Sequence, residues 1–81
     1  MSRSRDVVEV IGRVLADEAD DVTVDEREEK ESIYIELSVG KGGLGRMIGR
    51  QGRTAGAIRT LAELAADSEA ERVVVDFVDE S

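Results

Sequence analysis

The feature that most limits the folds open to this chain is a strand-like segment followed directly by a glycine-rich one. Apolar side chains occupy every second position from Ile33 to Val39, the period-two pattern of a strand with one buried face. Glycines then crowd the stretch from Gly40 to Gly52, and apolar residues at helical spacing follow from residue 53. This succession predicts an α+β domain in which helices pack on a sheet.

Charge is distributed unevenly around the glycines. No Asp or Glu occurs between Glu36 and Glu63, and that window carries five positive charges, whereas the rest of the chain carries a net charge of −13. Glycines with flanking arginines permit close approach of a phosphate backbone. The segment therefore predicts a nucleic-acid-binding site on an acidic protein, whose net charge of −8 opposes non-specific coating of a polyanion.

Composition excludes several function classes. The chain has 81 residues with no Cys and no His, so it has no disulfide, no thiolate metal site and no imidazole base. We expect no enzyme activity, no cofactor and no metal. No apolar run approaches the ~20 residues of a membrane span, and the first residues lack the apolar region of a signal peptide, so we expect a cytoplasmic protein without membrane contact.

The remaining elements follow from periodicity. Residues 6–19 predict a helix that an exposed Gly12 would weaken, 22–24 begin a strand, and the charged residues 25–32 predict a solvated hairpin turn. Residues 44–48 predict a short helix, 53–66 a longer one, and 72–78 the last strand. The longer helix carries one apolar face, formed by Ala55, Ile58, Leu61, Ala62 and Ala65. The expected order is α-β-β-α-α-β in a single domain, residues 1–81, with 1–5 and 80–81 flexible.

Residues 49–52 form a G-x-x-G sequence between the two helices. Its backbone N–H groups, the start of the next helix and the side chains of Arg50 and Gln51 could hold successive phosphates. An ordinary helix–helix turn has the same sequence pattern, but the surrounding basic residues favour the binding interpretation. The candidate RNA-binding residues are Lys41, Arg46, Ile48, Gly49, Arg50, Gln51, Gly52, Arg53 and Arg59.

The segment from Leu44 to Ala55 resembles the signature of KH domains. The whole chain resembles the small bacterial single-KH proteins of the KhpA type, whose type II (prokaryotic) order matches the one expected here. The resemblance implies a G-x-x-G loop that clamps a backbone of about four nucleotides and an aliphatic groove for the bases. Gly43 and Gly56 depart from the family pattern, which usually has an acidic and a basic residue there.

The resemblance also implies a biological role. It predicts a binder of single-stranded RNA that acts as an RNA chaperone or post-transcriptional regulator, with links to cell-wall biogenesis and cell shape. Its partners would be a second copy of the chain, a larger KH-containing protein, or both. Exposed aliphatic residues of the last strand, such as Val74 and Val78, are candidates for that contact.

Two other interpretations remain open at this point. One is a protein-interaction adaptor whose KH fold mainly mediates dimerisation, favoured by the acidity and by the presence of only two aromatic residues, Tyr34 and Phe77. The other is a nucleotide-binding enzyme, because residues 40–45 match G-x-G-x-x-G. The short chain and the expected antiparallel hairpin disfavour the enzyme, since a doubly wound sheet needs more strands.

Overall fold

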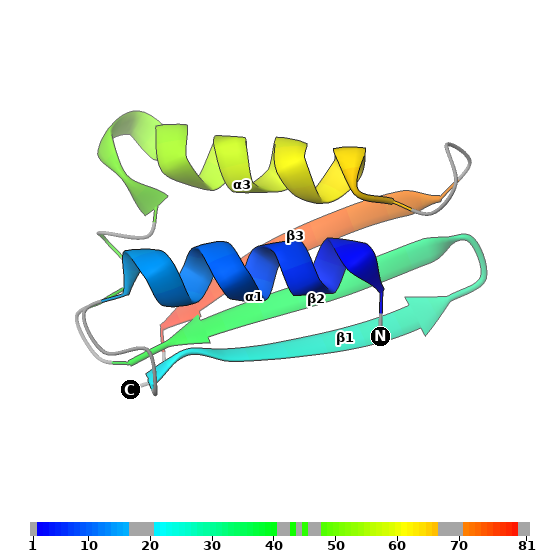
Figure 1. Ribbon diagram of the computed structural model, residues 1–81, viewed down its shortest axis with the longest axis horizontal. Coiled ribbons are helices and arrows are strands. Elements are labelled where there is room, and N and C mark those ends of the chain that lie inside the picture. Colours follow the sequence, from blue (N-terminus) through cyan, green and yellow to red (C-terminus); the bar gives the residue numbers. More distant parts are fainter. Residues whose placement is uncertain are drawn as a thin grey trace.

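The computed structural model describes residues 2–16, 21–40, 43, 45, 48–66 and 71–79, with Arg50 described by its backbone only. Its elements are α1 (Arg3–Leu15), β1 (Thr23–Glu29), β2 (Ser32–Val39), the 3-10 turn η2 (Arg50–Gly52), α3 (Arg53–Leu64) and β3 (Arg72–Asp79) (Figure 1). Gly45 and Ile48 are also helical. The rest of the short helix predicted over 44–48 lies outside the described residues.

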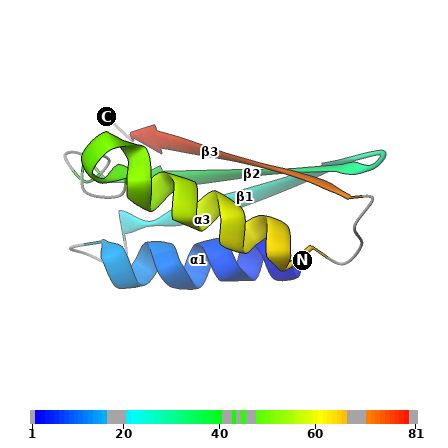
Figure 2. The same cartoon turned by 90° about the horizontal axis from the view of Figure 1, so that it is seen from above.

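The three strands form one mixed sheet in the order β1-β2-β3. β1 and β2 pair antiparallel through a turn at Lys30 and Glu31, as the sequence predicted, and β2 pairs parallel with β3. A parallel pair requires a crossover connection, and α3 lies in that connection. Both helices lie against the same face of the sheet and leave the other face open (Figure 2). The expected α+β architecture is confirmed.

The core lies between the helices and the covered face of the sheet. The alternating residues of β2, from Ile33 to Val39, are at most 2% exposed, which confirms the strand pattern. Val8 of α1 and Ile58 of α3 pack against them. Leu61, which the sequence placed on the same face of α3, is 45% exposed, because its position lies at the margin of the packed stripe.

The predicted boundaries of the first helix, 6–19, are wrong. Ser2 is the N-cap and its Oγ accepts a hydrogen bond from the Arg5 N–H at 3.0 Å, whereas Ala16 has extended backbone angles and ends the helix. Residues 2–5, which were predicted to be flexible, thus form the cap and the first turn of α1. Ser4 is fully buried, and its Oγ donates to the Ala62 carbonyl at 2.6 Å.

Gly12 is a contact point between α1 and the sheet. The sequence predicted a local weakness if Gly12 were exposed, but Gly12 is buried. A Cβ at this position would stand 3.0 Å from Leu37 Cδ1, so the missing side chain lets the helix approach β2 closely.

The charged residues 25–29 are part of β1, and only residues 30 and 31 form the turn. The strand therefore extends farther into the charge run than predicted. Its open face is exposed to solvent, and charged side chains are tolerated there without burial.

Ion pairs link successive turns of α1 on the side that faces β1. Glu9 accepts from Arg5 Nη1 at 2.8 Å and from Arg13 Nη2 at 3.0 Å. The hydrogen bond from Arg5, and then that from Arg13, lower the pKa of Glu9 below its ordinary value. Arg5 also donates to the Val24 carbonyl at 3.3 Å, so the pair links α1 to β1.

Candidate nucleic-acid interface

The G-x-x-G loop is a tight turn built on left-handed backbone. Gly49 has φ 78°, Gln51 φ 57° and Gly52 φ 72°, values that L residues other than Asn and Asp rarely adopt. The Gly49 N–H donates to the Gly45 carbonyl at 3.0 Å, and the Gly52 N–H donates to the Gly49 carbonyl at 3.2 Å. The two glycines are thus required where the chain reverses between two helical segments.

The two glycines differ in their surroundings. A Cβ on Gly49 would overlap Thr54 Oγ1 and would lie 2.9 Å from Thr54 Cβ, whereas a Cβ on Gly52 would have nothing within 4 Å. Gly49 therefore serves the packing of the loop against α3. Gly52 keeps the space in front of the helix open.

The N-terminus of α3 is available to an anion. Gly52 is its N-cap and supplies no side-chain hydrogen bond, and the first turn carries no acidic residue. The first N–H groups of a helix lack intrahelical partners and attract negative charge. Gln51 and Arg53 are exposed beside them. This arrangement of donors and positive charge is suited to phosphate groups.

The structure locates only part of the predicted basic cluster. Arg53 and Arg59 both lie on α3, and Ile48 is half-buried beside the loop. Lys41 and Arg46 lie outside the described residues, as does the side chain of Arg50. Whether all five cations converge therefore stays a prediction.

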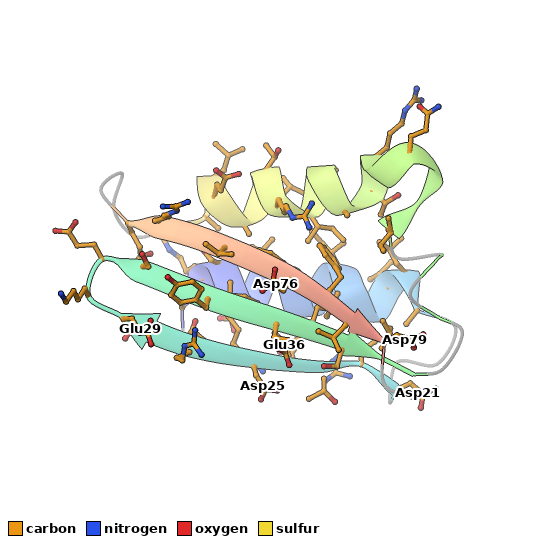
Figure 3. The ribbon with its side chains drawn as sticks, turned by 180° about the vertical axis from the view of Figure 1, so that it is seen from behind. Asp21, Asp25, Glu29, Glu36, Asp76 and Asp79 are labelled. Atoms are coloured by element: carbon orange, nitrogen blue, oxygen red, sulfur yellow. The ribbon has the colours of Figure 1, made fainter. Side chains whose placement is uncertain are left out.

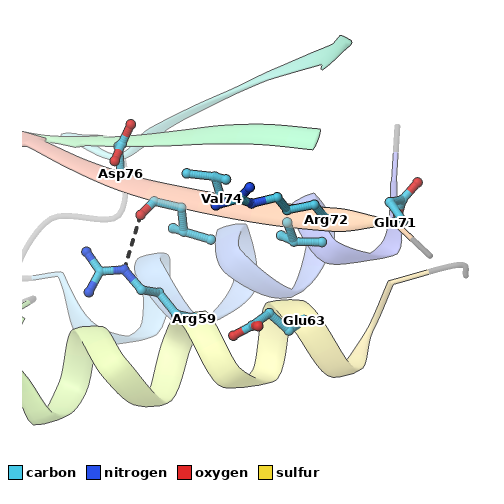
Figure 4. Close-up of a pocket in the computed structure, with 8 residues that line it drawn as sticks. Arg59, Glu63, Glu71, Arg72, Val74 and Asp76 are labelled. Atoms are coloured by element: carbon cyan, nitrogen blue, oxygen red, sulfur yellow. Dashed lines mark hydrogen bonds between the residues drawn. The ribbon is translucent and has the colours of Figure 1, made fainter. Parts of the chain in front are cut away.

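A groove of about 620 Å³ runs between α3 and β3. Arg59 and Glu63 line it from the helix, and Glu71 together with residues 72–76 lines it from the strand (Figure 4). The aliphatic groove implied by the resemblance is thus partly polar, since Val73, Val74 and Val75 share it with charged side chains. That β3 forms one wall of the groove was not predicted, because the strand order that makes β3 an edge strand depends on residues far apart in the sequence.

Arg59 spans this groove. Its Nε donates to the Val75 carbonyl at 3.2 Å, and its guanidinium carbon lies 5.1 Å from the centre of the Phe77 ring. A cation over an aromatic face is attracted to the ring. Both contacts hold the side chain across the groove, from α3 to β3.

The open face of the sheet has the opposite charge. Asp25 pairs with Glu36 and Glu36 with Asp76, so three carboxylates form a row across the strands (Figure 3). Neighbouring like charges repel each other and also any polyanion. Asp25 and Glu36 thus lie on the face away from α3, whereas Asp76 borders the groove together with Glu63 and Glu71. Among the described residues, no group of His, Cys, Asp or Glu is placed to hold a metal ion.

The dinucleotide interpretation of residues 40–45 finds no support in the fold. The sheet that the described residues form has three strands with one antiparallel pair, which is not a doubly wound sheet. No helix among the described residues is long and apolar enough to cross a membrane.

Comparison with known proteins agrees with this architecture. A family model described as "KhpA/KhpB, KH domain" matches residues 5–77. The RNA-binding protein KhpA of Halalkalibacterium halodurans is 44% identical over 73 residues, which cover 90% of this chain and 96% of that protein. The RNA-binding protein KhpA of Clostridium perfringens is 43% identical over 74 residues, which cover 91% of this chain and 99% of that protein.

A more distant relative spans the chain almost completely. The RNA-binding protein KhpA of Aquifex aeolicus is 38% identical over 79 residues, covering 98% of this chain and 100% of that protein. None of the solved structures matches significantly. With a family match over residues 5–77 and relatives of nearly equal length, the chain belongs to the KhpA/KhpB family of KH domains.

Proposed function

We propose that this protein is a non-enzymatic binder of single-stranded RNA. The observation that carries the proposal is the G-x-x-G loop in front of the N-terminus of α3, which has no side-chain cap. Phosphates would lie against residues 49–53, and the bases would enter the groove between α3 and β3. The relatives named RNA-binding protein KhpA support the same conclusion.

Single strands fit this site better than duplexes do. The groove is bounded by a helix on one side and a strand on the other, and bases reach such a groove only when they are not paired in an A-form helix. We therefore expect duplex RNA of the same length to bind more weakly than single-stranded RNA.

The double variant Arg50→Asp with Gln51→Asp tests the loop. Two carboxylates would face the phosphates, and we expect RNA binding to be lost while the fold is kept, since substitutions at surface loop positions such as the exposed Gln51 change stability by about 0.5 kcal/mol or less. Thr23→Asp with Arg27→Asp is the matched control, because it makes the same net charge change at exposed positions of β1. Equal RNA affinity of the loop variant and the wild type in fluorescence anisotropy would refute the clamp.

Salt dependence provides an independent test. With three or four phosphate contacts and a slope of about −0.7 per contact for single strands, the logarithm of the affinity should fall by roughly 2 to 3 per decade of salt. A flat response would show that the basic loop is not the binding surface.

We further propose a homodimer formed through the outer face of the helical layer. Val10 and Val14 of α1 and Leu61 and Leu64 of α3 are 63%, 76%, 45% and 77% exposed, and α1 and α3 pack side by side. Large apolar side chains that are exposed on both helices of one layer are typical of an interaction surface. A two-fold contact would cover both copies of it. This face carries more exposed apolar surface than β3, where Val74 is half-buried and Val78 is 36% exposed.

Sedimentation at micromolar concentration tests the dimer. Leu64→Lys should shift the protein toward monomer, whereas Thr23→Lys, the same charge change on the open sheet face, should not. If the wild type is a monomer and binds a larger KH-containing protein through this face, that protein is the partner in place of a second copy. If the protein is a dimer and the loop variant binds RNA as well as the wild type does, the loop is not the clamp, and the adaptor function is favoured.

The cellular role we propose is that of an RNA chaperone or post-transcriptional regulator that affects cell-wall synthesis and cell shape. Membership of the KhpA/KhpB family supports this proposal. Sequencing of RNA crosslinked to the wild type and to the loop variant would identify transcripts that depend on the clamp. Equal recovery of RNA by the two proteins would contradict the role.

A further inference from the structure

β3 is an edge strand, and its free side borders the groove. It pairs with β2 alone, and backbone carbonyls along a strand point alternately to its two sides. The Val75 carbonyl points to the free side, where it accepts the hydrogen bond from Arg59 Nε (Figure 4). An unoccupied carbonyl at this place would accept a hydrogen bond from the amino group of a base. Arg59 already uses one of the two lone pairs of this carbonyl.

Arg59 offers only donors to the groove. Among the described residues, its interactions are the hydrogen bond to Val75 and the contact with the Phe77 ring, so Nη1 and Nη2 keep their donors for a ligand. A guanidinium has five N–H donors in a planar fork and no acceptor. The ring contact holds the guanidinium carbon 5.1 Å from the centre of the Phe77 ring and so positions the fork in the groove.

The charges around Arg59 favour a base over a phosphate as its partner. Three carboxylates line the groove: Glu63 lies one helical turn farther along α3, Glu71 lies at the end distant from the loop, and Asp76 follows Val75. Arg72 is the second cation of the lining. Carboxylates repel phosphate groups, whereas the loop and the first turn of α3 carry no acidic residue. The RNA backbone is therefore attracted to the loop, and base edges are left to face Arg59.

We propose that Arg59 selects guanine over adenine at the nucleotide that lies against the middle of β3. This inference rests on the proposed binding of single-stranded RNA. Guanine presents two adjacent acceptors, O6 and N7, which match an arginine fork. Adenine presents an amino group in place of O6. That group would face the donors of Arg59, so adenine would offer the fork N7 as its only acceptor.

Short RNAs with one variable position test the selection. Each probe is an oligouridine that carries a single guanine or a single adenine, and its affinity is measured by fluorescence anisotropy. We expect guanine to bind about 10-fold more tightly, as for other bidentate arginine contacts. Inosine, which keeps O6 and N7, should bind like guanine, and 7-deazaguanine, which lacks N7, should lose the advantage.

Two matched lysine variants assign the selection to Arg59. Arg59→Lys keeps the charge but removes the fork, and the ratio of guanine to adenine affinity should fall toward one. Arg27→Lys is the control, because Arg27 lies over the Tyr34 ring at 4.8 Å on the open face of the sheet, and it should keep the wild-type ratio. Thermal unfolding checks that both variants fold.

The possible failures are distinguishable. If no RNA of any sequence binds, the proposed function itself is wrong. If RNA binds with equal affinity for guanine and adenine, or if Arg59→Lys keeps the wild-type ratio, RNA binding stands and the selection by Arg59 is overturned.

Discussion

Alanine should change the stability of this domain in opposite directions at three of its glycines. Gly49 and Gly52 belong to the loop and have positive φ, whereas Gly56 lies inside α3. A Cβ at Gly52 or Gly56 would meet nothing within 4 Å, but at Gly49 it would meet Thr54. The three sites thus separate backbone strain, steric overlap and helix propensity.

The magnitudes follow from these surroundings. At Gly52, left-handed backbone costs an L residue about 1–2 kcal/mol, and the lower entropy of the unfolded chain offsets about 0.4–1 kcal/mol of this. Gly49→Ala carries the same strain and an overlap that costs about 1–3 kcal/mol more. We therefore expect a loss of about 1 kcal/mol for Gly52→Ala and about 2–4 kcal/mol for Gly49→Ala. Gly56→Ala should gain about 1 kcal/mol.

Thermal unfolding measures all three variants. A change of 1 kcal/mol shifts Tm by about 4–8 °C in a domain of this size. Gly49→Ala should thus lower Tm by about 8–30 °C, Gly52→Ala should lower it by about 4–8 °C, and Gly56→Ala should raise it by about 4–8 °C. In a Thr54→Ala background the closest atom, Oγ1, is absent, and the cost of Gly49→Ala should decrease.

Two results would each refute part of this reasoning. If Gly49→Ala is no more destabilising than Gly52→Ala, the contact with Thr54 does not restrict the loop, and only the backbone angles matter. If the Thr54→Ala background leaves the cost of Gly49→Ala unchanged, the overlap does not involve Oγ1.

Further predictions concern the helices and the charged surface. Ser4→Ala should destabilise the fold by about 1–3 kcal/mol in denaturant unfolding, because it removes the buried donor to the Ala62 carbonyl. Thr60→Ala removes an exposed hydroxyl that donates to Gly56 within α3, and it should change stability by about 0.5 kcal/mol or less. Added salt should raise Tm even as it weakens RNA binding, because it screens the carboxylate row on the open face, and Glu36→Gln, which removes the middle of the row, should flatten that response. Because the pKa of Glu9 is lowered in the folded protein, the ionised Glu9 stabilises the fold at pH values above its ordinary pKa of 4.5. This contribution is lost as the pH falls through the lowered pKa. Glu9→Gln should therefore be less stable than the wild type at neutral pH and equally stable once Glu9 is protonated in both states.

Local pattern was sufficient to predict much of this fold. The alternation in β2 and the apolar spacing in α3 each report on one element and its own buried face, and both are found in the structure. The G-x-x-G sequence predicted a sharp turn in the same way, because left-handed backbone depends on the residues at the turn themselves.

Features that depend on distant residues could not be predicted in this way. The start of α1 at Arg3 depends on the burial of Ser4 under Ala62 of α3, and Gly12 is favourable only because Leu37 packs against it. The groove and the position of Arg59 follow from the parallel pairing of β2 with β3. No local pattern distinguishes a parallel from an antiparallel partner for a short apolar strand.

The parallel pairing of β2 with β3 also constrains the order in which the molecule can fold. Ile33 pairs with Val73, so this contact closes a long stretch of chain that includes the loop and α3, and such closure is slow compared with hairpin formation. A nascent chain that has left the ribosome only as far as α3 can form the β1–β2 hairpin. It has only one wall of the groove and no carbonyl for Arg59. Recognition of a base in the groove therefore begins only after β3 has docked, and RNA near the site of synthesis cannot occupy the groove of a half-made chain.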